Sequence, residues 1–176
     1  MYYNVIKLRK IIISDASTLI LLQKIDLLDK LVKNFVFIIP QEVYSESVIK
    51  GKKIKSKDSY LIEGKIDGRI IKIKKIKDLK KISQIINEFG IEKGEAEAIA
   101  LFLQENADIL AIDDHKAINV CKIYKIPFMT ALTFVITAFD AKLIVKNEAK
   151  KMIENLGIYG RYKDELVYKA LNYIGA

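Results

Sequence analysis

Short apolar runs alternate with amphipathic segments along most of the chain. The first run, IIIS at residues 11–14, precedes a segment whose apolar residues recur at helical spacing, namely Leu21, Leu22, Ile25, Leu28 and Val32. The second run, FVFII at residues 35–39, ends at Pro40, which favours the start of a helix in PQEVYSESVI. The pattern therefore predicts strand, helix, strand and helix in this part of the chain.

The rest of the chain continues the alternation. We expect strands at RIIKIKK (69–75), at DILAI (108–112) and near PFMTA (127–131). Helices are predicted at about 77–89, in KGEAEAIALFLQEN (93–106) and in HKAINVCKIY (115–124), with further helical segments up to the C-terminus. The alternating lysines of 69–75 indicate a strand at the edge of a sheet. Strands joined by helices of this length predict an α/β fold with a parallel sheet covered on both faces.

Acidic residues follow three of the predicted strands. Asp15 comes directly after IIIS, Glu46 lies shortly after FVFII, and both Asp113 and Asp114 come directly after DILAI. Ligands of open parallel sheets bind beyond the carboxyl ends of the strands. We therefore expect these acids to lie on one rim of the sheet.

The helix that begins near Gly94 adds two more candidates. Its buried stripe is predicted at Ala96, Ile99, Ala100 and Leu103. At about 100° per residue, Glu95 and Glu97 lie on opposite flanks of this stripe. Helical geometry alone leaves both glutamates as candidates for the rim.

Converging carboxylates repel one another, so they raise their pKa values or bind cations. Oxygen-rich acidic sites suit Mg²⁺ or Mn²⁺, and two such ions about 4 Å apart activate water against a phosphodiester. Each acid also has a structural interpretation: Asp15, Asp113 or Asp114 caps the following helix, and Glu95 favours its helix dipole. The residues alone leave both interpretations open.

Composition agrees with one globular domain, because 51% of the 176 residues are hydrophobic and 30% are charged. The net charge of +8 favours polyanions such as nucleic acid. The lysine-rich block at residues 51–81 is interpreted as chiefly solvated surface. Abundant lysine and isoleucine fit a thermophilic source.

Cysteine usage and hydropathy indicate where the protein acts. A single Cys121 excludes an internal disulfide, no secretory signal pattern is recognised, and no apolar run reaches the roughly 18 residues that a membrane span needs. We therefore expect a cytoplasmic protein that does not span a membrane.

The remaining reactive side chains favour structural roles. His115 follows the aspartate pair at a helix start and is interpreted as solvated, and Cys121 lies on an apolar helical stripe and is predicted to be core. A group of tyrosines near the C-terminus either stacks RNA bases or belongs to the core or an interface: Tyr159, Tyr162, Tyr168 and Tyr173.

Four segments together resemble a known family. IIISDASTLILL, IIPQEVYSESV, KGEAEAIALF and LAIDDHKAINVCKIYKIPFMTA resemble, in this order, the PIN-domain ribonucleases, especially the prokaryotic PIN-like branch with Gly-Glu-x-Glu-Ala and Asp-Asp motifs. The C-terminal tail resembles the helices that end that branch. The resemblance implies a single three-layer PIN-like domain over residues 1–176, with sheet order 3-2-1-4-5. Its core would span about 10–140 and its C-terminal helical extension about 141–176.

The resemblance also implies a metal site of three or four acids. Asp15, in Asp-x-Ser, would be the first metal ligand, with Ser17 hydrogen-bonding near it. Glu46, in Pro-x-x-Val-x-x-Glu, would be the second. The neighbouring Glu42 is better placed to favour the helix N-terminus.

The third and fourth acids come from the later motifs. Glu95 is the third by its match to the family's acid-Ala pattern, and Glu97 is the alternative. Asp114 would be the final acid, with Asp113 as a second ligand or a helix cap. Many PIN domains have Thr-x-Asp here, whereas this chain has Ile112 in place of the threonine.

The implied function is a Mg²⁺- or Mn²⁺-dependent endoribonuclease. Many relatives are toxins of toxin/antitoxin pairs, so RNA, a small antitoxin protein and a second copy of the chain are the expected partners. The alternative is a catalytically weak PIN-like module that binds RNA. A phosphohydrolase with Asp15 as nucleophile is disfavoured because the usual Asp-x-Asp is Asp-Ala-Ser here, and no Gly-rich nucleotide-binding motif is present.

Overall fold

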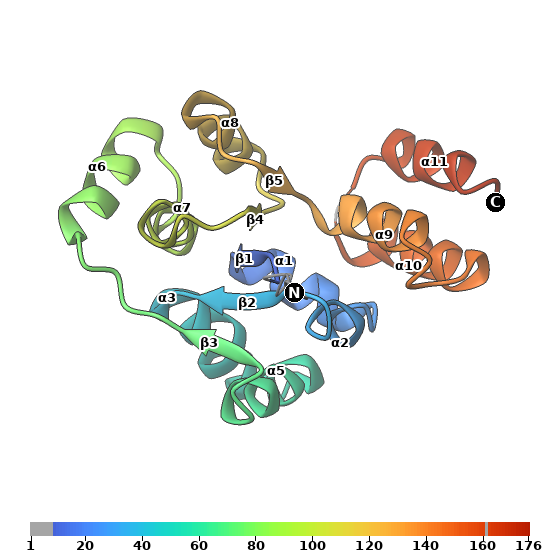
Figure 1. Ribbon diagram of the computed structural model, residues 1–176, viewed down its shortest axis with the longest axis horizontal. Coiled ribbons are helices and arrows are strands. Elements are labelled where there is room, and N and C mark those ends of the chain that lie inside the picture. Colours follow the sequence, from blue (N-terminus) through green and yellow to red (C-terminus); the bar gives the residue numbers. More distant parts are fainter. Residues whose placement is uncertain (1–8, 161) are drawn as a thin grey trace, which may run out of the picture.

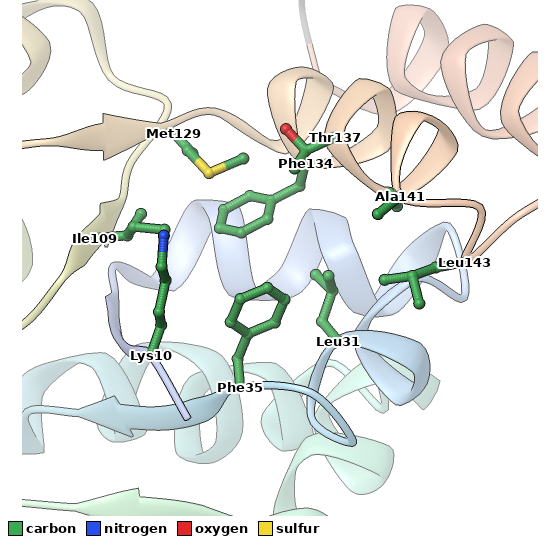
Figure 2. A pocket seen from close by; sticks show the side chains of 10 residues that line it. Lys10, Leu31, Phe35, Ile109, Met129, Phe134, Thr137, Ala141 and Leu143 are labelled. Atoms are coloured by element: carbon green, nitrogen blue, oxygen red, sulfur yellow. The ribbon is translucent and has the colours of Figure 1, made fainter. Parts of the chain in front are cut away.

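A computed structural model describes residues 9–160 and 162–176 of the protein (Figure 1). Five parallel strands form one sheet in the order β3-β2-β1-β4-β5, which confirms the predicted α/β class and the order that the resemblance implies. The strands are β1 Ile11–Ser14, β2 Val36–Ile39, β3 Ile71–Ile73, β4 Ile109–Ala111 and β5 Phe128–Met129.

Alternate residues of the strands enter two hydrophobic clusters, one on each face of the sheet. On one face Ile12 and Phe37 pack with residues of α1, α5, α9 and α10, and on the other Ile13 and Leu110 pack with residues of α6, α7 and α8. Figure 1 shows α6, α7 and α8 on one side of the sheet and α9, α10 and α11 on the other. Burial on both faces explains why the central strands are continuous apolar runs.

The helices that cover the sheet follow the strands in sequence. They are α1 Ala16–Lys24, α2 Leu28–Leu31, α3 Gln41–Tyr44, the π-helix η1 Ser45–Lys50, α4 Gly51–Lys53, α5 Lys57–Asp67, α6 Leu79–Phe89, α7 Lys93–Glu105, α8 His115–Tyr124, α9 Ala131–Asp140, α10 Lys146–Tyr159 and α11 Asp164–Tyr173.

Two expectations for the first half of the chain need correction. The apolar spacing through Val32 indicated one helix, but the chain breaks between α1 and α2, where Asp26 has a φ of 60°. The break lets the adjacent Leu27 and Leu28 both become fully buried. The lysine-rich block contains α5, which was not predicted, and its Lys65 is buried and pairs with Asp29 at 2.9 Å.

The predicted stripe of α7 is largely confirmed. Ala96, Ile99 and Ala100 are buried, but Leu103 is 38% exposed and does not face the sheet. β3 occupies the edge of the sheet as its alternating lysines predicted, with Ile71 buried and Lys72 exposed.

The C-terminal helices share the core rather than standing apart from it. Ala149, Ile153 and Leu156 of α10 and Ala170 of α11 belong to the same hydrophobic cluster as β1 and β2. The division into a core up to about residue 140 and an extension remains a prediction. Within the described residues, no helix is both long enough and apolar enough to cross a membrane.

Gln23 of α1 gives a test of the packing. Its side chain is 1% exposed, and neither amide atom has a hydrogen-bond partner within the described ranges. An unbonded buried amide costs about 1–3 kcal/mol. Gln23→Leu should therefore raise the free energy of unfolding by at least about 1 kcal/mol in urea titrations.

The matched control is Gln84→Leu, at an exposed position of α6. This change should alter the free energy of unfolding by less than about 0.5 kcal/mol. A Gln23→Leu variant with a lower free energy of unfolding than the wild type would show that the Gln23 side-chain amide has hydrogen-bond partners in the folded protein.

Candidate active site

Asp15 lies where β1 ends and α1 begins. Its backbone N–H donates to the Ala111 carbonyl at 3.0 Å, which ties the carboxyl ends of β1 and β4 together. Its side chain caps α1 by accepting from the Thr18 N–H at 2.8 Å, and it also accepts from the Ser17 hydroxyl at 2.7 Å. With 3% exposure, this carboxylate is held in one position at the bottom of the rim.

Glu95 comes to the same rim from the first turn of α7. Its Oε2 accepts from the Glu92 N–H at 3.1 Å, the spacing of a capping box. This hydrogen bond leaves Oε1 free of any hydrogen bond from the described chain. Glu95 therefore presents one oxygen beyond its helix N-terminus.

Asp114 caps α8 and has a similar arrangement. Its Oδ1 accepts from the N–H groups of Lys116 at 2.7 Å and Ala117 at 3.0 Å. Its Oδ2 accepts no hydrogen bond from the part of the chain that the structure describes. The cap and the free oxygen belong to one side chain, so capping does not exclude a role at the site.

Asp113 does not cap α8, one of the two roles expected of it. Its carboxylate accepts instead from the Ala131 N–H at 3.1 Å and from the hydroxyl of Tyr162. The same hydroxyl accepts from the Leu132 N–H at 3.2 Å. Asp113 thus joins the end of β4 to the start of α9 and to the segment after α10.

Glu46 lies in the π-helix η1, beside the start of α7. A Cβ at Gly94 would stand 2.8 Å from Glu46 Oε2, so the absence of a side chain there makes room for this carboxylate. Lys50 lies 3.7 Å from its Oε1. Single π-type turns inside α-helices are frequent at functional sites.

Glu97 is separated from the other acids. Its buried side chain accepts from the Glu42 N–H at the start of α3 at 3.0 Å, and Lys93 lies 3.6 Å away. Glu42 in turn pairs with Lys93 at 2.6 Å, in the first turn of α3 as the sequence indicated. The structure thus separates two glutamates that helical geometry alone left equivalent: Glu95 faces the rim, and Glu97 stabilises α3.

An open cleft of about 550 Å³ lies at this rim. Three of the predicted acids line it, Glu95, Asp113 and Asp114, whereas Glu46 and the buried Asp15 are not among its lining residues. Sequence reasoning missed Glu92 as a member, although its position three residues before Glu95 is a capping-box signal. The full lining is Ser17, Ile20, Leu21, Lys24, Glu92, Glu95, Asp113, Asp114, Tyr159 and Gly160.

A family model described as a PIN domain matches residues 11–175. This chain belongs to the PIN-domain family. PIN domains are generally nucleases and typically use divalent metals. No curated protein sequence matches the chain.

Burial and mutual repulsion raise the pKa values of several acids of this PIN domain. Burial raises the pKa of Asp15 to about 6 against its hydrogen bonds from Thr18 and Ser17. Burial also raises the pKa of Glu95 to about 7, and the charges of Asp114 and Asp15 add to the rise. The pKa of Glu46 is raised by burial in the same direction. The rim therefore concentrates negative charge that a cation would relieve.

The donors suit Mg²⁺ or Mn²⁺ by their chemistry. Within residues 9–160 and 162–176, no group of three or more carboxylate, imidazole or thiol side chains converges closely enough to hold a metal ion. Mg²⁺ takes only one or two protein carboxylates and keeps several waters. Glu95 and Asp114, which have one free oxygen each and line one cleft, are the residues that could hold such an ion.

The remaining candidates have the structural roles expected of them. His115 is exposed at the start of α8, with its Nδ1 3.5 Å from the side-chain amide of Asn119. Cys121 is fully buried, and burial raises the pKa of its thiol to about 12, which excludes a ready thiolate. Ile112 is fully buried and donates its N–H to the Met129 carbonyl, so it has only a packing role.

Asp15→Asn tests the electrostatics of the site in metal-free protein. The folded-state pKa lies above the usual value of 3.8, so the folded chain retains a proton that the unfolded chain releases. Wild-type stability therefore falls as pH rises from about 4 to about 6. The amide keeps the acceptor for Thr18 but has no charge, so the variant should lack the share of the fall that comes from Asp15, about 3 kcal/mol, and retain the share that comes from Glu95.

The measurement is urea unfolding in EDTA from pH 4 to pH 8. Added Mg²⁺ should stabilise the wild type more than the variant, because a ligand stabilises the state that binds it. Parallel stability curves for the two proteins would contradict the raised pKa.

Proposed function

We propose that this PIN domain is a metal-dependent endoribonuclease that hydrolyses RNA phosphodiester bonds at the acidic cleft. The observation that carries the proposal is that Glu95 and Asp114, from the helices that precede and follow β4 in sequence, each have one free oxygen and line the same cleft. We propose Mg²⁺ or Mn²⁺ as cofactor, with Asp15 and Glu46 completing the set of four acids. Asp113 would act by holding α9 and Tyr162 in place.

The chemistry that a divalent ion supplies when bound is activation of water and stabilisation of charge on the phosphate. The protein's own contribution is preorganisation. Hydrogen bonds from Thr18 and Ser17 fix Asp15, a helix cap fixes Asp114, and the Glu92 N–H fixes Glu95. Each carboxylate is therefore oriented before substrate arrives.

The proposal also covers the partners of the protein and its location in the cell. The net charge of +8 supports binding of a polyanion in spite of the acidic cleft. We propose that the protein acts in the cytoplasm as a homodimer and as the toxin of a toxin/antitoxin pair, neutralised by a small antitoxin protein.

A catalytically weak RNA-binding module is the second candidate. Two observations favour it: Ile112 supplies no hydroxyl before the aspartate pair, and no group of three acids converges within the described chain. In this case the basic surface would bind RNA and the acids would be residual.

Cleavage of a mixed RNA pool with Mn²⁺ separates these candidates. Asp15→Asn and Asp114→Asn each keep a capping acceptor but remove a charge, so both should lower the cleavage rate by about a hundredfold or more while leaving the fold intact. EDTA should abolish cleavage, and Glu88→Gln, at an exposed position of α6, should not change it. Equal cleavage by wild type and both site variants would refute the site, and RNA binding without cleavage would favour the second candidate.

Gly94→Ala tests the position of Glu46. The added Cβ would meet the end of the flexible Glu46 side chain at 2.8 Å, so the carboxylate must move while the helix tolerates alanine. We expect an unchanged or higher melting temperature, because alanine favours a helix by up to about 1 kcal/mol over glycine, together with at least about a tenfold loss of cleavage.

Gly64→Ala is the control for this variant. Gly64 also lies within a helix, α5, and a Cβ there meets nothing within 4 Å. This variant should show the same gain in melting temperature with full cleavage. Full cleavage by Gly94→Ala as well would remove Glu46 from the site.

A further inference from the structure

A lysine and a tyrosine stand together on the wall of the acidic cleft. Lys24 ends α1 and Tyr159 ends α10, and both line the cleft that Glu95 and Asp114 also line. The Lys24 ammonium lies 5.0 Å from the centre of the Tyr159 ring. Segments far apart in the sequence thus bring a cation and an aromatic ring to one place beside the acids.

Both side chains are open to a ligand. Tyr159 is 49% exposed and the Lys24 side chain 37% exposed. Asp58 lies 3.6 Å from the ammonium, which is a long, partly exposed contact that contributes little. The Lys24 charge is therefore available to an anion that enters the cleft.

Gly160 and Tyr162 link the end of α10 to the acidic rim. A Cβ at Gly160 would stand 2.6 Å from the ring of Tyr162, so the absence of a side chain at Gly160 makes room for this ring. The hydroxyl of Tyr162 then donates to Asp113 at the end of β4. One contact therefore ties the end of α10 to the acidic rim.

We propose that Lys24 and Tyr159 form a subsite for an unpaired nucleotide next to the cleaved phosphodiester. The base stacks on the Tyr159 ring, and a backbone phosphate pairs with the Lys24 ammonium. The subsite rests on the proposed nuclease function and adds two residues, outside the acids, that would hold the substrate. It also supplies what the acids lack, a positive charge that offsets their repulsion of the phosphates.

The pair of chemical groups favours single-stranded RNA over a duplex. Aromatic side chains stack on bases that are splayed out of a helix, and such stacking is tolerant of sequence. A lysine pairs with phosphate as a point charge without reading the base. We therefore expect a preference for unpaired segments and little preference for their sequence.

The chain offers a matched control pair on another surface. The Lys52 ammonium lies 5.4 Å from the centre of the Tyr60 ring, Tyr60 is 50% exposed and the Lys52 side chain is 37% exposed. Glu63 pairs with Lys52 at 2.8 Å, closer than Asp58 lies to Lys24. Neither residue lines the acidic cleft. The two lysine–tyrosine pairs therefore differ in location and in how closely a carboxylate pairs with the lysine, and Tyr60 is the closer match for Tyr159.

The test is binding of a fluorescein-labelled oligouridylate decamer by the full chain in EDTA, followed by fluorescence anisotropy. Tyr159→Ala should weaken binding by about tenfold or more, whereas Tyr159→Phe should stay within about twofold of wild type. Lys24→Gln should make the slope of log affinity against log salt shallower by about 0.7. A duplex of the same length should bind equally to wild type and Tyr159→Ala.

Several results would overturn the subsite. They are unchanged binding by Tyr159→Ala, an equal loss in Tyr60→Ala and Lys52→Gln, or no binding of the decamer by wild type. Circular dichroism checks that each variant is folded, and the Phe variant keeps the test valid if the Ala variant is not. Binding in EDTA does not require cleavage, so the two proposals can fail separately. If the wild type binds the decamer as expected but never cleaves RNA, the nuclease proposal alone is refuted. If the wild type cleaves RNA and Tyr159→Ala binds the decamer as well as the wild type does, the subsite alone is refuted.

Discussion

Negative charge gathered at the carboxyl ends of a buried parallel sheet is the constraint on which the site depends. Asp15 and Glu95 are removed from water by the packing around them, which raises the pKa values of both. The protein limits the repulsion by placing the acids at helix N-termini, where N–H groups and the helix dipole favour negative charge. The remaining excess charge is what makes the cleft of this PIN domain suited to a divalent cation.

Capping and site chemistry are two uses of the same carboxylates. Asp15 caps α1, Asp114 caps α8, and Glu95 accepts from the N–H that precedes α7. A helix cap uses one oxygen and fixes the other, so the structural role orients the chemical one. The two interpretations that compete in the sequence are therefore compatible in the fold.

Contacts of Asp113 extend this organisation to the C-terminal helices. Through Ala131 and Tyr162, the end of β4 is bonded to the start of α9 and to the chain that follows α10. Tyr159, the last residue of α10, lines the cleft, while α10 buries its apolar face in the main core. The C-terminal helices thus help to form the cleft as well as to cover the sheet.

The sequence by itself determined the α/β class and the approximate places of the strands, because apolar periodicity is a local property, and it placed Asp15, Asp113 and Asp114 directly after strands. Helical geometry could not separate Glu95 from Glu97, although the family resemblance favoured Glu95. The structure distinguishes them, because Glu97 accepts from the Glu42 N–H whereas Glu95 lines the cleft. The sequence also could not place Tyr159 in the cleft, find α5 within its lysine-rich block or give Asp113 its partners. Those depend on contacts between segments far apart in the chain, which only the tertiary structure brings together.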